Sequence, residues 1–269
     1  MTHPLLFSLA ALAALAPITV ASLRSIKQGM KRSQAPLLLV AFAGALVAVV
    51  MPFLTAGSWV GGFSSTLWFS IAASIAVYML VSMISPEVRK LGPLFFGYLF
   101  LLGLLATVWG GAGHDESLKS SGDPWLVLHI IFALATYALS TIAAVAALGT
   151  QIQQRALKRK EPTALSRSLP SVSDGDRLLL NLLMAAGVVL GLGVVTGSVL
   201  QLAIGAGFLP FDHKTVFSLA ALVIIAVLLW VHQSTGLRGR RAAQLVLACY
   251  LLLTLAFPGV KFVTDVLLG

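Results

Sequence analysis

The sequence predicts an all-α fold, a polytopic membrane helix bundle of about eight transmembrane helices, and three observations support this prediction. Hydrophobic residues fill 58% of the 269 positions and charged residues only 10%, whereas about 25% of residues are charged in an ordinary soluble domain. Apolar runs of about 20 residues, the length that crosses the hydrocarbon core of a bilayer, make up most of the chain. Because hydrocarbon offers the backbone no hydrogen-bond partners, each run must be helical.

Eight apolar runs of spanning length follow one another along the chain. They predict helices near residues 4–23, 36–55, 65–85, 92–109, 125–150, 177–203, 214–231 and 243–266. We interpret residues 1–269 as a single integral membrane domain. The first run has no basic segment before it and no clear Ala-x-Ala motif after it, so we expect a retained helix. The longest connection, residues 151–176, mixes basic residues with Ser, Pro and Gly, which is typical of a flexible connector.

The basic residues lie mainly in alternate connections between the predicted helices. Fifteen of the 18 share one side: Arg24, Lys27, Lys31, Arg32, Arg89, Lys90, Arg155, Lys158, Arg159, Lys160, Arg167, Arg177, Arg238, Arg240 and Arg241. Because connections rich in Lys and Arg stay in the cytoplasm, both termini are expected on the non-cytoplasmic side of the cell's inner (plasma) membrane. The net charge of +9 therefore indicates contact with anionic lipid head groups and not with nucleic acid.

Several kinds of chemistry lack their residues in this sequence. The predicted helices carry no Asp, Glu, Lys or Arg near their centres, so an ion-coupled carrier would lack its intramembrane charges. HExxH, Walker and G-x-S-x-G motifs are absent, and with them the usual metalloprotease, nucleotide and hydrolase sites. The single cysteine, Cys249, excludes an internal disulfide or a CxxC pair. The sequence does not predict an enzyme.

The sixth predicted helix carries two pairs of glycines at four-residue spacing. Gly187 and Gly191 form one pair, and Gly193 and Gly197 form the other. This spacing places small residues on one helix face, where a second backbone can approach closely. We favour a close helix crossing within one subunit over a dimer interface.

The five histidines are the candidate ligands. His3 lies at the terminus, His232 at the inner end of the seventh predicted helix, and three others, His114, His129 and His213, near the outer face. A neutral imidazole binds haem iron well, although a histidine at a helix end often only hydrogen-bonds to backbone or lipid. His129 differs because it follows WLVL and precedes a long uncharged run, so it is expected to be buried and to need a partner.

Five segments of the chain carry a resemblance to a known family. They are LHIIFALATYAL (128–139), TG (196–197), FDHKTVFSLAAL (211–222), LLWVH (228–232) and GLRGRRAA (236–243). In order and spacing, residues 125–265 resemble the second half of the cytochrome c assembly family of membrane proteins, the CcsA, CcmC and HemX/YpjD-type group. The fuller members of this family handle haem with a tryptophan-rich WWD loop and with outer histidines that ligate the iron.

The resemblance assigns roles to four residues. His129 matches the histidine that opens the helix before the WWD loop, and His232 resembles the histidine at the inner end of the following helix. Asp212 and Lys214 match the Asp and Lys that end the loop. The resemblance therefore implies that these four residues contact the cofactor.

Two departures from the family pattern affect the expected ligands. The loop tryptophans are missing, with Leu209 and Phe211 in their place, and the second outer histidine is missing because the chain ends in DVLLG. These losses place the chain closest to the HemX/YpjD-like branch, which lacks the full motif. His129 and His213 are both expected at the outer membrane level, so we expect His213 to replace the missing ligand and the pair to bind the haem iron.

The expected function is haem binding or haem handling, in an accessory or regulatory role. The expected partners are the lipid bilayer, haem, and other cytochrome assembly or membrane proteins. Two alternatives remain open: a scaffolding membrane protein with a vestigial haem pocket, and a transporter of haem or another small molecule.

Overall fold

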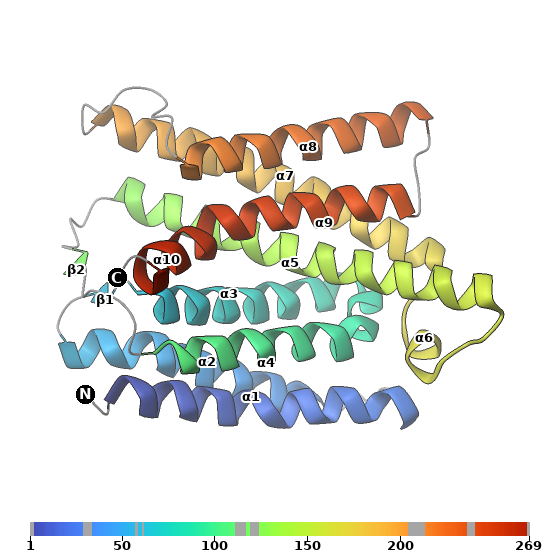
Figure 1. Cartoon of the computed structure of the whole chain (residues 1–269), viewed down its shortest axis with the longest axis horizontal. Coiled ribbons are helices and arrows are strands. Elements are labelled where there is room, and N and C mark those ends of the chain that lie inside the picture. Colours follow the sequence, from blue (N-terminus) through green and yellow to red (C-terminus); the bar gives the residue numbers. More distant parts are fainter. Residues whose placement is uncertain are drawn as a thin grey trace.

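The structure is a computed structural model that describes residues 3–28, 34–56, 59–60, 62–110, 117–118, 124–203, 213–235 and 240–267. Over these ranges the chain forms a bundle of helices, as Figure 1 shows. Eight of the described helices are long and apolar enough to cross a membrane. The predicted all-α polytopic bundle is therefore confirmed, and the protein is an integral membrane protein.

The long helices agree with the eight predicted ones. They are α1 (His3–Gln28), α2 (Ala35–Ala56), α3 (Phe63–Ile84), α4 (Gly92–Val108), α5 (Pro124–Arg159), α7 (Val172–Ala203), α8 (His213–Thr235) and α9 (Arg240–Thr254). The shorter elements are a 3₁₀ helix (Pro86–Leu91), α6 (Ala164–Ser168), α10 (Val260–Phe262) and two-residue strands β1 (Trp59–Val60) and β2 (Ser117–Leu118). The eighth span, Arg241–Val266, continues past α9 through π-helical turns and α10. The strands pair antiparallel, with Trp59 opposite Leu118.

α5 is the central helix of the bundle. It packs against α3, α7 and α9, and 67% of its most apolar segment is buried, compared with at most 44% for the other spanning helices. Its buried face carries small residues such as Ala143, Ala147 and Gly149, which let neighbouring helices approach. At Gly149 an added Cβ would lie 3.3 Å from a methyl group of Leu91. The short side chains of α5 therefore set the closeness of the packing around it.

The first four helices pack around a core of large side chains. Trp68 on α3 is fully buried, and its indole N–H donates to the hydroxyl oxygen of Ser8 on α1 at 3.2 Å. Tyr78 stacks on Phe95 with ring centroids 4.6 Å apart, and Phe96 meets both rings edge-on. Since a buried indole N–H needs a partner, the bond to Ser8 fixes α1 against α3.

The connection at residues 151–176 is mostly helical, so the expectation of a flexible connector is wrong. α5 continues through the basic segment to Arg159, and α6 follows. The side-chain amide of Gln153 donates to the carbonyl of Pro170 at 3.2 Å, and Leu169 is buried. Lys and Arg have high helix propensity and are favourable near a helix C-terminus. α5 therefore remains helical beyond residue 150, where the apolar run ends.

The two ends of the bundle differ in their residues. In Figure 1, α1, α5 and α8 begin at one end, near α10, which we call the histidine end. α5 finishes and α6 lies at the opposite end, which we call the basic end because it carries Arg155, Lys158 and Arg167.

After α9 the chain widens into a π-helical turn, Leu255–Gly259, that contains Pro258, a residue without the N–H needed for regular helix bonding.

Candidate functional site

His129 lies in the second turn of α5, partly exposed, and its imidazole meets α7. Nδ1 is 3.0 Å from the carbonyl oxygen of Gly193. The hydroxyl oxygen of Thr196 is 3.5 Å from the same nitrogen but 3.0 Å from the carbonyl oxygens of both Leu192 and Gly193. The threonine proton therefore goes to the backbone of its own helix, and the principal partner of Nδ1 is the Gly193 carbonyl.

This hydrogen bond determines which imidazole nitrogen can bind a ligand. A carbonyl oxygen only accepts, so Nδ1 of His129 must carry the proton and donate to Gly193. In the neutral ring, Nε2 then holds the free electron pair. Histidines that bind metals usually donate their other ring N–H to a carbonyl or carboxylate in this way, which fixes the ring orientation. The arrangement leaves Nε2 of His129 as a preoriented electron-pair donor.

Gly197 makes room for the imidazole. A Cβ at this position would lie 2.9 Å from Cε1 and 3.1 Å from Nδ1 of His129, closer than packed carbon atoms approach at optimal contact. One turn earlier, a Cβ at Gly193 would lie 3.6 Å from Cβ of Phe132. The second glycine pair of α7 therefore brings α7 against α5 at the level of His129, and Gly197 must lack a side chain for the ring to lie there.

The other glycine pair contacts α8 through one member. A Cβ at Gly187 would lie 2.8 Å from a methyl carbon of Ile225, whereas nothing lies within 4 Å of a Cβ at Gly191. Three of the four glycines thus lie at crossings between helices of one chain. The prediction of a close crossing within one subunit is confirmed for Gly187, Gly193 and Gly197.

The remaining predicted site residues are only partly described. Asp212 lies outside the described residues, and His213 and Lys214 form the first turn of α8, with side chains outside the description. His232 occupies the last turn of α8, 19 residues after His213 and hence about 28 Å along the helix axis. His232 therefore lies toward the basic end, whereas α5 and α8 place His129 and the backbone of His213 at the histidine end.

Sequence reasoning missed a cluster of phenols deeper in the bundle. The hydroxyl oxygens of Tyr98 on α4 and Tyr250 on α9 lie 2.6 Å apart, and the Tyr250 hydroxyl donates to that of Tyr137 on α5 at 3.1 Å. Thr141 adds a longer contact of 3.3 Å to Tyr250. The chain has only four tyrosines, and since a phenol in hydrocarbon needs a partner, their positions inside apolar runs were the signal for this cluster.

Two hydroxyl groups beside Tyr137 on α5 lack such partners. Thr136 and Ser140 are buried, and neither hydroxyl oxygen forms a hydrogen bond. They lie within one turn of Tyr137 on the same helix. Across the described part of the chain, no three His, Cys, Asp or Glu side chains gather closely enough to hold a metal ion by themselves.

Comparison with known proteins identifies the family. The family model described as cytochrome C assembly protein matches residues 30–268. An uncharacterized 28.8 kDa protein from the nifR3-like 5′ region of Azospirillum brasilense is 44% identical over the full length of both chains. The inner membrane protein YpjD of Escherichia coli K12 is 30% identical over 144 residues, 54% of each chain. No solved structure matches. The match over nearly the whole sequence means that this chain belongs to the cytochrome c assembly protein family.

Proposed function

We propose that this protein binds or helps to handle haem at the histidine end of the bundle, as an accessory or regulatory member of its family. The observation that carries the proposal is the 3.0 Å contact between Nδ1 of His129 and the carbonyl oxygen of Gly193. That contact leaves Nε2 with the electron pair that an iron ligand needs. Membership of the cytochrome c assembly family supports a haem-related function in general.

The donor set at His129 suits a metal that already carries most of its ligands. Haem supplies an iron already held by four porphyrin nitrogens, so one or two histidines complete its coordination. Several apolar side chains at this level of α5, α7 and α8 are exposed: Leu128, Ile131, Val195, Leu202 and Val216. Exposed apolar side chains in this part of the bundle are compatible with an apolar group, and the Gly193 carbonyl holds the imidazole of His129 in place.

The proposal assigns roles to the residues at the start of α8. His213 begins this helix at the same end of the bundle as His129, and we assign it as the second iron ligand. The family pattern assigns Asp212 and Lys214 as residues that contact the cofactor. The ammonium group of Lys214 is suited to pairing with the propionate carboxylates at the edge of a haem. Because His232 lies at the far end of α8, its proposed cofactor contact would belong to a separate site near the basic end.

The proposed setting is the inner (plasma) membrane, with one membrane domain over residues 1–269 and both termini on the non-cytoplasmic side. The inner membrane protein YpjD supports the location, and the gathering of Arg155, Lys158 and Arg167 at the basic end supports the orientation. Other cytochrome assembly or membrane proteins are the proposed partners. The missing loop tryptophans favour an accessory role over a synthase.

An absorption spectrum of the purified protein tests the proposal. After haemin is added and the sample is washed, the wild type should retain a Soret band. His129→Ala should insert and accumulate like the wild type but lose or alter that band, because no neighbouring apolar side chain can replace the ligand. His3→Ala, at the terminus, is the matched control and should leave the spectrum unchanged.

The alternatives give different results in the same experiment. A wild-type protein that takes up no haem would overturn the proposal and favour a scaffolding role with a vestigial pocket. If haem binds but its spectrum is unchanged by His129→Ala, then His129 is not an iron ligand and the proposed site is wrong. Haem movement across vesicle membranes that contain the protein would favour the transporter reading, which the uncharged centres of the predicted helices do not support.

A further inference from the structure

α5 extends well beyond the hydrocarbon layer at the basic end. It runs from Pro124 to Arg159, about 54 Å of helix, whereas the hydrocarbon core of a bilayer is about 30 Å thick. Trp125, exposed near the start of α5, is typical of the membrane interface. Gln151 lies 26 residues farther on, or about 39 Å along the axis, which places it in the lipid head-group layer of the opposite face.

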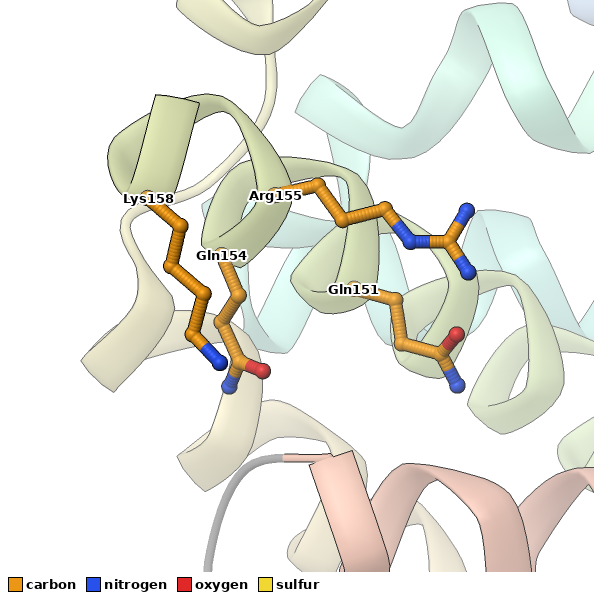
Figure 2. A pocket seen from close by; sticks show the side chains of 4 residues that line it. All are labelled: Gln151, Gln154, Arg155 and Lys158. Carbon is orange, nitrogen blue, oxygen red and sulfur yellow. The ribbon is translucent and has the colours of Figure 1, made fainter. Parts of the chain in front are cut away.

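Four side chains of this extension line a small cavity. Gln151, Gln154, Arg155 and Lys158 line a half-open volume of about 150 Å³ on the surface of α5. Their spacing of three and four residues places all four on one face of the helix. Figure 2 shows the ends of Lys158 and Gln154 close together, with the Arg155 guanidinium and the Gln151 carboxamide extending to the other side.

The lining is positively charged and unneutralised within the described part of the chain. Arg155 and Lys158 contribute two cations, and no acidic side chain lines the cavity. Among the described residues, neither cation forms an ion pair, whereas Nζ of Lys90 lies 2.7 Å from Oε2 of Glu87. The carboxamide N–H groups of Gln151 and Gln154 add neutral donors. Two cations and several N–H donors along one groove suit a phosphate group, which accepts hydrogen bonds on several oxygens.

The residue next toward the membrane indicates where such a phosphate would come from. Leu148 precedes Gln151 by three residues on the same helix face, and it is 43% exposed. An exposed leucine directly below a polar, cationic cavity matches the layout of a phospholipid, with its acyl chain below its phosphate. Lys and Arg residues that lie beside a membrane span attract anionic lipid head groups.

We propose that the cavity lined by Gln151, Gln154, Arg155 and Lys158 binds the phosphate of one anionic phospholipid. The Arg155 guanidinium and the Lys158 ammonium neutralise the phosphate, the two carboxamides donate to its oxygens, and Leu148 contacts the acyl chain. This site is separate from the proposed haem site, because His129 lies 22 residues from Gln151, about 33 Å along α5. It does not depend on whether haem is bound.

Native mass spectrometry of the detergent-purified full chain tests this inference. The protein is titrated with phosphatidylglycerol, with phosphatidylcholine, or with inorganic phosphate, and lipid adducts are counted. We expect one phosphatidylglycerol to bind much more tightly than phosphatidylcholine. Arg155→Gln with Lys158→Gln should weaken that binding about 25-fold, since each substitution replaces a charge-assisted hydrogen bond to the phosphate by a neutral one, a loss of about fivefold. Arg159→Gln with Lys160→Gln removes the same charge beside the cavity, and should retain the tight binding.

Each comparison can contradict the proposal. If the two double variants lose phosphatidylglycerol binding equally, the lipid is held by general charge attraction, and the proposal of a specific site is wrong. Displacement of the lipid by inorganic phosphate at equal concentration would overturn the lipid assignment in favour of a soluble phosphate ligand. Thermal unfolding in phosphatidylcholine alone checks that both double variants fold, and Lys158→Gln by itself, with an expected loss of about fivefold, serves if the double variant does not.

Discussion

The imidazole of His129 and the carbonyl of Gly193 are joined by a 3.0 Å hydrogen bond between α5 and α7. The donor is on the central helix of the bundle, and the acceptor is a backbone group that cannot change its rotamer. The ring is therefore oriented by the helix crossing itself, and the proposed function depends on how closely these two helices meet.

Gly197→Ala should displace the His129 ring without removing any ligand atom. The added Cβ would lie 2.9 Å from Cε1 of the imidazole, and overpacking of this kind costs about 1–3 kcal/mol. We expect the variant to insert normally but to bind haem more weakly, with a shifted Soret band. Gly191→Ala is the matched control, because nothing lies within 4 Å of its added Cβ. Equal haem titration curves for the two variants would contradict the proposed position of the ligand.

His213→Ala tests the assignment of the second iron ligand. If His213 binds the iron opposite His129, its loss should change a six-coordinate haem spectrum to a five-coordinate one while some haem remains bound. Magnetic circular dichroism or resonance Raman spectra distinguish these two states. An unchanged spectrum would keep His129 in the site but exclude His213, and His114 would then be the next candidate.

Tyr250→Phe should destabilise the bundle more than the removal of other buried hydroxyls. The variant takes the shared hydrogen-bond partner from Tyr98 and Tyr137, and leaving buried polar groups unpaired costs about 1–3 kcal/mol. Ser140→Ala is the control, since its hydroxyl is buried without a hydrogen bond and its loss should be neutral or slightly stabilising. Unfolding in mixed micelles, followed by circular dichroism, measures both. A Ser140→Ala effect as large as that of Tyr250→Phe would refute this reading of the cluster.

Reporter fusions test the proposed orientation. An alkaline phosphatase, which is active only outside the cytoplasm, should be active when fused after Gly269 and inactive when inserted at Glu161, between α5 and α6. The expected pattern follows from the basic residues gathered at the α6 end. The reverse pattern would place the histidine end in the cytoplasm and with it the proposed haem site.

Hydropathy was sufficient to predict the spanning helices, because the bilayer requires about 20 apolar residues and a fully bonded backbone. The same criterion ended the fifth helix near residue 150, although α5 continues to Arg159. Helix formation depends on backbone bonding and side-chain propensity, and Arg, Lys and Gln satisfy both in water. Apolar length therefore marks the membrane level but not the end of a helix.

The sequence predicted the side chain of the candidate site, His129, but not the backbone group that it contacts. An isolated imidazole in an apolar run indicated that His129 needs a partner, and the spacing of Gly193 and Gly197 indicated a close crossing. The sequence could not connect the two, because the acceptor is a main-chain carbonyl, which every residue carries. The phenol cluster was missed for a related reason: Tyr98 and Tyr250 are 152 positions apart, and no local pattern relates them.

The cluster of Tyr98, Tyr137 and Tyr250 has a consequence for the order in which the protein is made. Tyr98 enters the membrane early and Tyr137 next, but the hydroxyl that joins them belongs to α9, the last long helix to be synthesised. Until the ribosome has released that segment, two phenols lie in the bundle without their common partner. A chain truncated before α9 therefore lacks the hydroxyl that Tyr98 and Tyr137 both contact in the complete protein, so this part of the polar core is completed last.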